Sequence, residues 1–348
     1  MQTLSESAAY TAIARTLDGN YEAIAKLHAR HPSWLAAWNT LAPTSPINPL
    51  ALWTQCERAG IRLLLAADFD FPPLLREIPN PPFAIYMKGT LPRVDPCIAI
   101  VGTRRASPAG KTIARQFAQT LSRACVPIVS GLALGIDAEA HLGALEGGAP
   151  TVAVLACGLD AVYPRQHTTL AKRIIAHGGA LISEYAPGTP AYPAHFLERN
   201  RIVAGLSRGA LIVEAPLQSG ALATSRFALE QNRDVFVVPG PITHPNYIGS
   251  LGLLKSGAIL VTTADDILRE YNIAPLANTA TAIPPSLAPN EQTVYRILAE
   301  AHGALAVDQI VACVTLSPQV VSRILSTLVL QDVVVERAGN YSLPTARS

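Results

Sequence analysis

Residues 97–137 read CIAIVGTRRASPAGKTIARQFAQTLSRACVPIVSGLALGID, and this stretch decides the fold. The apolar run at 97–101 predicts a buried strand that leads into Gly102 and a polar turn with Arg104 and Arg105. Glycine lets the backbone approach a ligand closely, and the helix that follows presents free N–H groups and a partial positive charge. The stretch therefore predicts an anion-binding loop at a strand end.

The next strand end repeats this arrangement. A second apolar run, 127–129, leads into Ser130 and Gly131 just before another helix. Further apolar runs alternate with amphipathic helices, which predicts a doubly wound, mostly parallel, Rossmann-like α/β sheet whose ligand lies off the carboxyl ends of the strands. The apolar runs are 97–101, 127–129, 151–156, 180–183, 210–213, 235–238 and 259–261, with a candidate edge strand at 84–88.

Four segments follow from the pattern along the chain. Residues 1–65 predict a small helical, SAM-like domain, and residues 66–272 predict the Rossmann-like domain together with an N-terminal connector. Residues 273–290 contain no charged residue and are predicted to be a linker. Residues 291–348 predict three helices and a hairpin, the winged-helix pattern. This segment has four Arg and five acidic residues, so we expect a protein-contact or packing role for it rather than DNA reading.

Bulk composition limits the class of protein. The 348 residues are 49% hydrophobic with a net charge of +2, so a large core is expected and any polyanion site must be a local cluster of arginines. The five cysteines are scattered without a C-x-x-C motif, which argues against zinc and disulfides and favours the reducing cytoplasm. No signal peptide or membrane span is expected.

Two common phosphate-binding motifs fail at the first strand end. A P-loop with Gly110 as its second glycine requires a first glycine where Arg105 stands. A dinucleotide fingerprint that starts at Gly102 requires its second glycine where Arg104 stands. We therefore expect no nucleotide cofactor. Arg104 supplies a bidentate donor in place of backbone N–H groups alone.

Residues 193–207, PAHFLERNRIVAGLS, place Phe196 close to Arg199 and Arg201. Arginine binds phosphate and an aromatic ring stacks on a base, so this combination suits single-stranded nucleic acid. The alternative is that Phe196 is a core residue and the arginines are paired with Glu198 or Glu214. Considered alone, the segment favours this alternative, and only together with Arg104 do the two interpretations carry about equal weight.

Other strand ends add weaker candidates. Gly158 ends a strand, and Ser219 with Gly220 begins a helix on the same predicted rim. Asp137 and His141 are spaced i, i+4 on one helix, and we interpret them as structural.

Together the segments VGTRR, SGLALGIDAEAH, AVLACGLDAVYP, FLERNRIVAGLS and IVEAPLQSGALATSRFALEQNRDVFVVPG resemble the DNA-processing protein A (DprA/Smf) family over residues 69–268. The resemblance implies a bacterial cytoplasmic protein that binds single-stranded DNA without sequence preference. It also implies protection of incoming strands during natural transformation, loading of the RecA recombinase, and a homodimer formed through the Rossmann-like domain. The family is not known as an enzyme.

The resemblance also assigns a positively charged pocket, to which we add Ser219 and Gly220 from the strand-end argument. Carried over by position, the pocket residues are Gly102, Arg104, Ser130, Gly131, Gly158, Phe196, Arg199, Asn200 and Arg201. The chain departs from the family at Thr103, where serine is usual, and at Leu251, where asparagine is usual.

A second hypothesis is a nucleotide-processing enzyme similar to nucleoside-monophosphate phosphoribohydrolases. Asp137, Glu214 or Glu230 would then act on a bound nucleotide. Those enzymes resemble one another in a P-G-G-x-G-T loop, and residues 219–224 lack its paired glycines. A third possibility, a scaffold independent of DNA, requires every arginine at the rim to be ion-paired.

Overall fold

The computed structural model describes residues 4–274, 287–300, 304–314, 316–331, 333–337 and 339–343. The chain divides into two compact units, Met1–Pro275 and Leu276–Ser348. Within the described residues, each helix is too short or too polar to cross a lipid bilayer.

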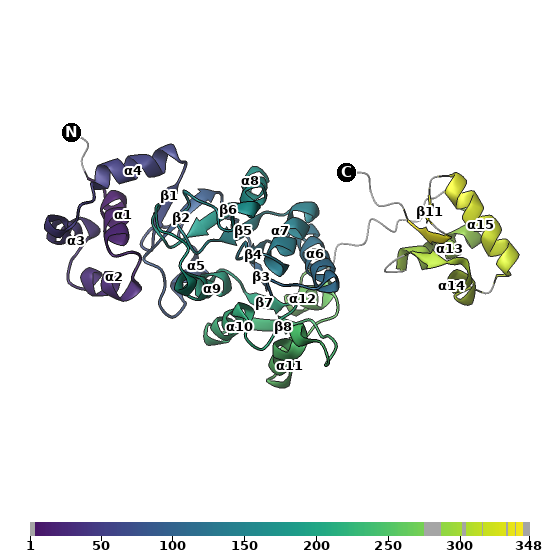
Figure 1. Ribbon diagram of the computed structural model, residues 1–348. Coiled ribbons are helices and arrows are strands. Elements are labelled where there is room, and N and C mark those ends of the chain that lie inside the picture. Colours follow the sequence, from purple (N-terminus) through teal and green to yellow (C-terminus); the bar gives the residue numbers. More distant parts are fainter. Residues whose placement is uncertain are drawn as a thin grey trace. The chain divides into compact units, whose positions relative to one another are not determined.

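The first unit is built on one nine-stranded sheet in the order β1-β2-β6-β5-β4-β3-β7-β8-β9 (Figure 1). The strands from β6 to β9 in this order are parallel, and β1 and β2 are antiparallel additions at one edge. This is the predicted doubly wound sheet. The strands are β1 (Arg62–Leu65), β2 (Ala84–Gly89), β3 (Ile98–Val101), β4 (Ile128–Ser130), β5 (Thr151–Val154), β6 (Ala180–Ser183), β7 (Gly209–Ile212), β8 (Asp234–Val237) and β9 (Ile259–Leu260).

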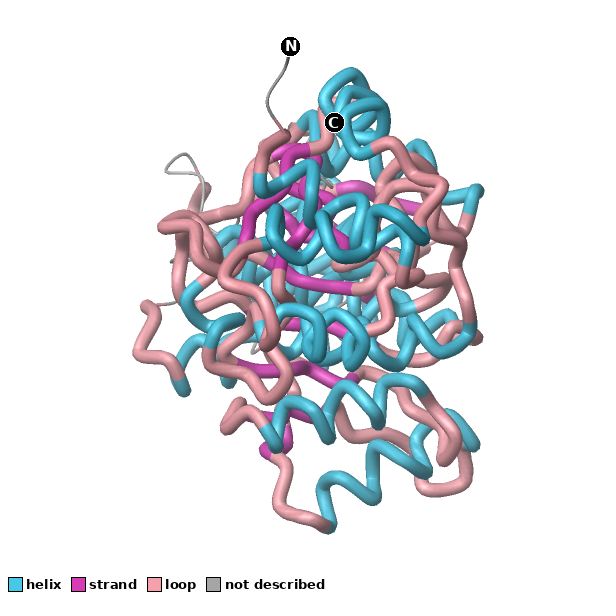
Figure 2. Tube along the Cα trace, turned by 90° about the vertical axis from the view of Figure 1, so that its left-hand side faces the viewer, coloured by secondary structure: helices cyan, strands magenta, loops and turns pink. Residues whose placement is uncertain are grey.

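Helices cover both faces of this sheet because alternate strand residues point to opposite faces. In β3, Ile98 and Ile100 pack with α6, α7 and α12, whereas Ala99 and Val101 pack with α5, α9 and α10. Figure 2 shows strands enclosed between helices. The helices are α5 (Pro73–Arg76), α6 (Pro108–Arg123), α7 (Ile136–Gly147), α8 (Thr168–Ala176), α9 (Pro193–Gly205), α10 (Gly220–Glu230), α11 (Ile248–Lys255) and α12 (Ala264–Glu270), with short 3-10 turns η2 (Arg165–His167) and η3 (Pro245–Tyr247).

The N-terminal helices lie beside the antiparallel edge of the sheet (Figure 1). Ile13 of α1 belongs to the same buried cluster as Leu63 of β1 and Leu181 of β6, so this helical region shares its core with the sheet. Residues 62–65 were expected to end the helical domain, but they form β1, with Leu63 opposite Tyr86. The helices are α1 (Glu6–Thr16), α2 (Tyr21–His28), α3 (Trp34–Leu41) and α4 (Pro49–Arg58), with a 3-10 turn η1 (Ala42–Thr44).

The second unit has the elements of a winged helix. Three helices pack around Leu325 and Leu328, and a small sheet has the order β10-β12-β11. Leu287 is already buried in this core, so the module begins before the predicted boundary at residue 291. Most of the predicted linker, residues 275–286, lies outside the described residues. The elements are α13 (Pro289–Glu300), β10 (Leu305–Ala306), α14 (Val307–Ala312), α15 (Pro318–Leu330), β11 (Val335–Arg337) and β12 (Asn340–Ser342).

Candidate functional site

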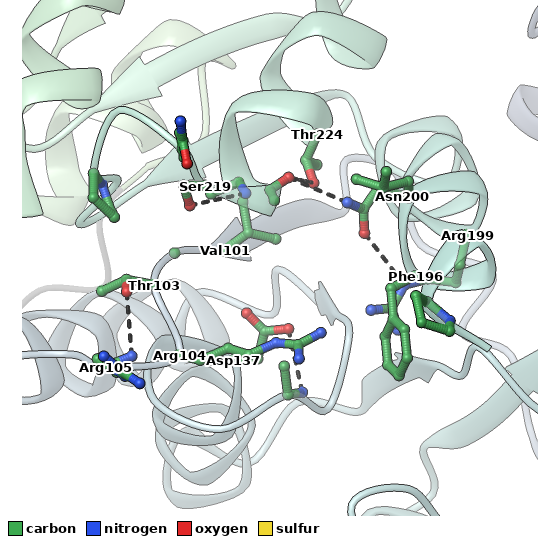
Figure 3. Close-up of a pocket in the computed structure, with 18 of the residues that line it drawn as sticks. Val101, Thr103, Arg104, Arg105, Asp137, Phe196, Arg199, Asn200, Ser219 and Thr224 are labelled. Carbon is green, nitrogen blue, oxygen red and sulfur yellow. Dashed lines mark hydrogen bonds between the residues drawn. The ribbon is translucent and has the colours of Figure 1, made fainter. Parts of the chain in front are cut away.

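A pocket of about 660 Å³ lies at the carboxyl ends of β3 and β7. These two strands are neighbours, and the sheet grows outward from them in both directions, so they form the topological switch point of the fold. Open α/β sheets bind ligands at this position because the loops diverge there and leave a crevice. The loop after β3, helix α9 and the first turn of α10 form the walls of the pocket (Figure 3).

The first wall is the arginine turn, residues 102–105. Gly102 is required there for packing, since a Cβ atom on it would lie 2.5 Å from Cγ1 of Ile136 in α7. The side chains of Arg104 and Arg105 are exposed. The guanidinium carbon of Arg104 lies 4.8 Å from the centre of the Phe196 ring, which is a cation–π contact.

The second wall is helix α9, which begins at Pro193, whereas the sequence pattern predicts a helix over residues 199–204 only. Proline at the first helical position was the signal in the sequence for this earlier start. Phe196, Arg199 and Asn200 are spaced i, i+3, i+4, so they share the helix face that lines the pocket (Figure 3). The Phe196 ring is partly exposed, and its centre lies 5.4 Å from that of Tyr163, which is 48% exposed.

Arg199 lines the bottom of the pocket and is buried, with only 4% of its surface exposed. Its Nη1 donates to the carbonyl oxygens of Gly131, at 2.8 Å, and Val154, and its Nε donates to Oδ1 of Asn200 at 3.3 Å. Burial lowers the pKa of the guanidinium, and nearby Asp137 offsets part of that effect. Arg199 therefore joins α9 to the ends of β4 and β5.

Asp137 of α7 lines the pocket beside Arg199. Its Oδ2 accepts hydrogen bonds from the N–H groups of Gly131, at 3.1 Å, and Ala133, at 3.3 Å. Burial raises the pKa of Asp137, while Arg199 acts in the opposite direction. His141 has a different partner, Oγ1 of Thr151 at 2.8 Å, and burial lowers the pKa of its imidazole to about 3.

The third wall is the start of α10. Ser219 caps the helix by accepting a hydrogen bond from the N–H of Ala221 at 3.2 Å. Asn200 donates to the carbonyl oxygen of Gly220 at 3.2 Å, so it ties α9 to α10. A Cβ atom on Gly220 would approach nothing closer than 3.9 Å, so this edge of the pocket is open.

The structure therefore brings together most of the expected residues: Gly102, Arg104, Phe196, Arg199, Asn200, Ser219 and Gly220. Ser130, Gly131 and Gly158 do not line the pocket. Oγ of Ser130 donates to the carbonyl of Ile100 at 2.6 Å, inside the sheet. The backbone of Gly131 accepts a hydrogen bond from Arg199 and donates one to Asp137. Gly158 packs against residues 186–189, and a Cβ atom on it would lie 2.6 Å from the carbonyl oxygen of Ala186.

Arg201 was expected in the pocket, but it does not line it. It follows Phe196 by five residues, which turns its side chain about 140° away around the helix. Its guanidinium forms a buried ion pair with Glu184 and lies 5.5 Å from the centre of the Tyr21 ring in α2. Arg201 thus faces the N-terminal helices, and its partner is neither of the carboxylates that the sequence suggested.

Sequence reasoning missed several pocket residues, namely Thr103, Arg105, Tyr163, Leu197 and Gln218. The doubled arginine in VGTRR was a visible signal for Arg105. Leu197 and Gln218 carry no recognisable motif, because only the approach of α9 to α10 gives them a shared surface.

The acidic residues of the enzyme hypothesis are mostly outside the pocket. Burial alone would raise the pKa of Glu214, but hydrogen bonds from Ser107 and Asn246 outweigh it and lower the pKa. Glu230 lies exposed on α10, 3.8 Å from Arg226. Of the three candidates, Asp137 alone lines the pocket among the described residues.

Comparison with known proteins gives matches over both units. Residues 62–272 match the family described as DNA recombination-mediator protein A, and residues 278–340 match the DprA winged helix domain. Protein Smf of Escherichia coli (strain K12) is 45% identical over 207 residues, which cover 59% of this chain. The match spans about half of that relative's length, 55%.

Two solved structures share the fold. DNA processing protein A from Streptococcus pneumoniae aligns with a TM-score of 0.60 and 35% identity, covering 68% of this chain and 81% of the other. DNA processing protein A from Helicobacter pylori, described by its single-stranded DNA binding mode, aligns with a TM-score of 0.54 and 28% identity, covering 61% and 95%. Because the family match takes in the greater part of the sequence, this chain belongs to the DNA recombination-mediator protein A family.

Proposed function

We propose that this chain binds single-stranded DNA without sequence preference at the switch-point pocket. The observation that carries the proposal is the exposed Arg104 guanidinium held over the Phe196 ring. The guanidinium supplies a phosphate contact, and the two partly exposed rings of Phe196 and Tyr163 supply faces on which any base can stack. The single-stranded DNA binding described for the Helicobacter pylori relative supports the same reading.

The proposal extends to the role of the whole protein. We infer that it acts in the cytoplasm as a recombination mediator, protecting incoming strands in natural transformation and loading RecA, as a homodimer formed through the Rossmann-like unit. The name of the matched family supports the mediator role.

We also propose that the chain is not an enzyme. Asp137 is the one acidic candidate in the pocket, and its Oδ2 is already bound by two backbone N–H groups. Glu214 is bound by Ser107 and Asn246, so neither carboxylate is placed as a free general base.

Fluorescence anisotropy with a labelled oligo-dT at two salt concentrations tests the pocket. Arg104→Ala is expected to make the negative slope of log affinity against log salt shallower by about 0.7, because one phosphate contact is lost. Phe196→Ala is expected to cost about 1–3 kcal/mol of binding free energy. The matched control is Arg123→Ala. It removes an exposed arginine from the last turn of α6, at the opposite end of that helix from the arginine turn.

Unchanged affinity in both pocket variants would rule out this site. Duplex DNA as competitor and AMP hydrolysis assayed in parallel separate the hypotheses. Hydrolysis that disappears with Asp137→Asn would favour the nucleotide-processing enzyme instead.

A further inference from the structure

We propose that Glu214 and Asn246 are positioning residues that hold the arginine turn in the conformation that receives the DNA backbone. This inference rests on the proposed function, and it assigns a role to two residues that do not line the pocket. Both reach the turn from outside, Glu214 from the end of β7 and Asn246 from η3.

Glu214 holds both ends of the arginine turn. Its backbone carbonyl accepts a hydrogen bond from the N–H of Thr103 at 2.8 Å, at the start of the turn. Its carboxylate accepts from the N–H of Ser107, at 3.0 Å, and from the Ser107 hydroxyl, just after the turn. The carboxylate is fully buried, so each of these bonds is shielded from water.

Asn246 secures the turn at Arg105, its last residue. Its Nδ2 donates to the carbonyl oxygen of Arg105 at 3.1 Å and to Oε2 of Glu214 at 2.9 Å. One amide group thereby links the turn to the buried carboxylate. Thr103, Arg105 and Ser107 are all anchored through backbone atoms, so the backbone on both sides of Arg104 is held.

The first turn of α6 completes the arrangement. Gly110 packs directly on the Glu214 carboxylate, and a Cβ atom there would collide with it. The N–H of Gly110 bonds to the Ser107 hydroxyl at 2.9 Å, which in turn donates to Glu214. A negative charge next to a helix N-terminus is favourable, in agreement with the lowered pKa of Glu214.

Holding the backbone has a direct consequence for binding. Neither the Arg104 nor the Arg105 side chain has a hydrogen-bonding partner among the described residues, so each guanidinium is available to a phosphate. A turn that is already ordered loses less conformational entropy when the ligand binds. The neutral Asn246 and the buried Glu214 thus contribute to affinity without touching DNA.

The test uses the full chain with Asn246→Ala and Glu214→Gln, measured for oligo-dT affinity and for amide hydrogen exchange across residues 103–107. Each variant is expected to weaken affinity about 3- to 10-fold, equivalent to one lost hydrogen bond, and to speed exchange in the turn. The matched control is Ser250→Ala. The Ser250 hydroxyl accepts from the N–H of Ala215, next to Glu214, at 2.9 Å but does not touch the turn, so this variant should leave affinity unchanged.

A double-mutant cycle decides whether the effect passes through the arginines. In an Arg104→Ala/Arg105→Ala background, Asn246→Ala is expected to cause no further loss of affinity. An undiminished loss in that background, or unchanged exchange across residues 103–107, would overturn the inference. Failure of the proposed function looks different, because the Arg104→Ala/Arg105→Ala variant would then bind as tightly as the unsubstituted protein while exchange still rises in Asn246→Ala.

Discussion

The arginine turn and helix α9 both bring arginines to the neighbourhood of the pocket, and they use them in opposite ways. The turn anchors its backbone and leaves the guanidinium groups of Arg104 and Arg105 exposed. Helix α9 buries the guanidinium groups of Arg199 and Arg201, which are occupied by carbonyl oxygens and by Glu184. Residue type alone therefore does not identify a DNA contact; the partners of each guanidinium do.

Helix geometry explains why the two arginines of α9 differ from each other. Successive residues are rotated by about 100°, so Arg199 shares the face of Phe196 whereas Arg201 points toward α2. One helix thus serves two neighbours, the pocket on one side and the N-terminal helices on the other. Three predictions test this division of roles.

The largest effect is expected for Arg199→Ala. The substitution removes the bonds to Gly131 and Val154 and leaves Asp137 buried without its nearby positive charge. We expect the free energy of unfolding to fall by about 3 kcal/mol.

Urea unfolding followed by tryptophan fluorescence measures this loss. The three tryptophans of the chain, Trp34, Trp38 and Trp53, all lie in the N-terminal helices of the first unit. Arg104→Ala serves as the exposed counterpart and should change stability by less than about 0.5 kcal/mol. Equal effects of the two substitutions would contradict the contrast between turn and helix.

A smaller loss of stability, about 2 kcal/mol, is expected for Arg201→Ala, because it leaves Glu184 partly buried and unpaired. The affinity of the folded protein for oligo-dT should stay within about 2-fold, since Arg201 does not line the pocket. A large loss of affinity at unchanged stability would return Arg201 to the binding site. Glu184→Gln, which alters the same pair from the other side, should behave in parallel.

The smallest effect concerns pH. It distinguishes Glu214, which supports the arginine turn, from Asp137, which lies beside Arg199 of α9. The pKa of Glu214 is lowered from 4.5, so its contribution to stability is present above that value and is lost as the pH falls through the lowered pKa. The pKa of Asp137 is raised from 3.8 by burial, so its ionisation reduces stability as the pH rises through the raised value.

Unfolding midpoints measured in steps from about pH 3 to about pH 7 show the difference. Glu214→Gln should flatten the loss of stability on the acid side, and Asp137→Asn should remove a decline at higher pH. Identical pH profiles for the two variants would show that burial and hydrogen bonding do not distinguish the two carboxylates.

Much of the fold was predictable because it depends on local patterns. The apolar runs identified β3 to β9 to within one or two residues, since buried parallel strands read as short continuous hydrophobic segments. β1 was missed, because RLLL is only four residues long and was assigned to the end of the helical region, although Gly60, with a φ of 66°, separates it from α4. The start of α9 was misplaced by six residues because the aromatic and charged residues there hid its periodicity.

The sequence by itself determined the alternating strands and helices of the sheet and the presence of a cationic turn in place of a glycine-only phosphate loop, because each depends on residues close together in the chain. The switch point arises only when β3 pairs with β7, more than a hundred residues later. Tertiary structure alone decided which arginines are exposed. Glu214 lies more than a hundred residues after the arginine turn, and Glu184 meets Arg201 only when α9 packs on the sheet. Such pairings arise from how the elements pack, and no local pattern encodes them.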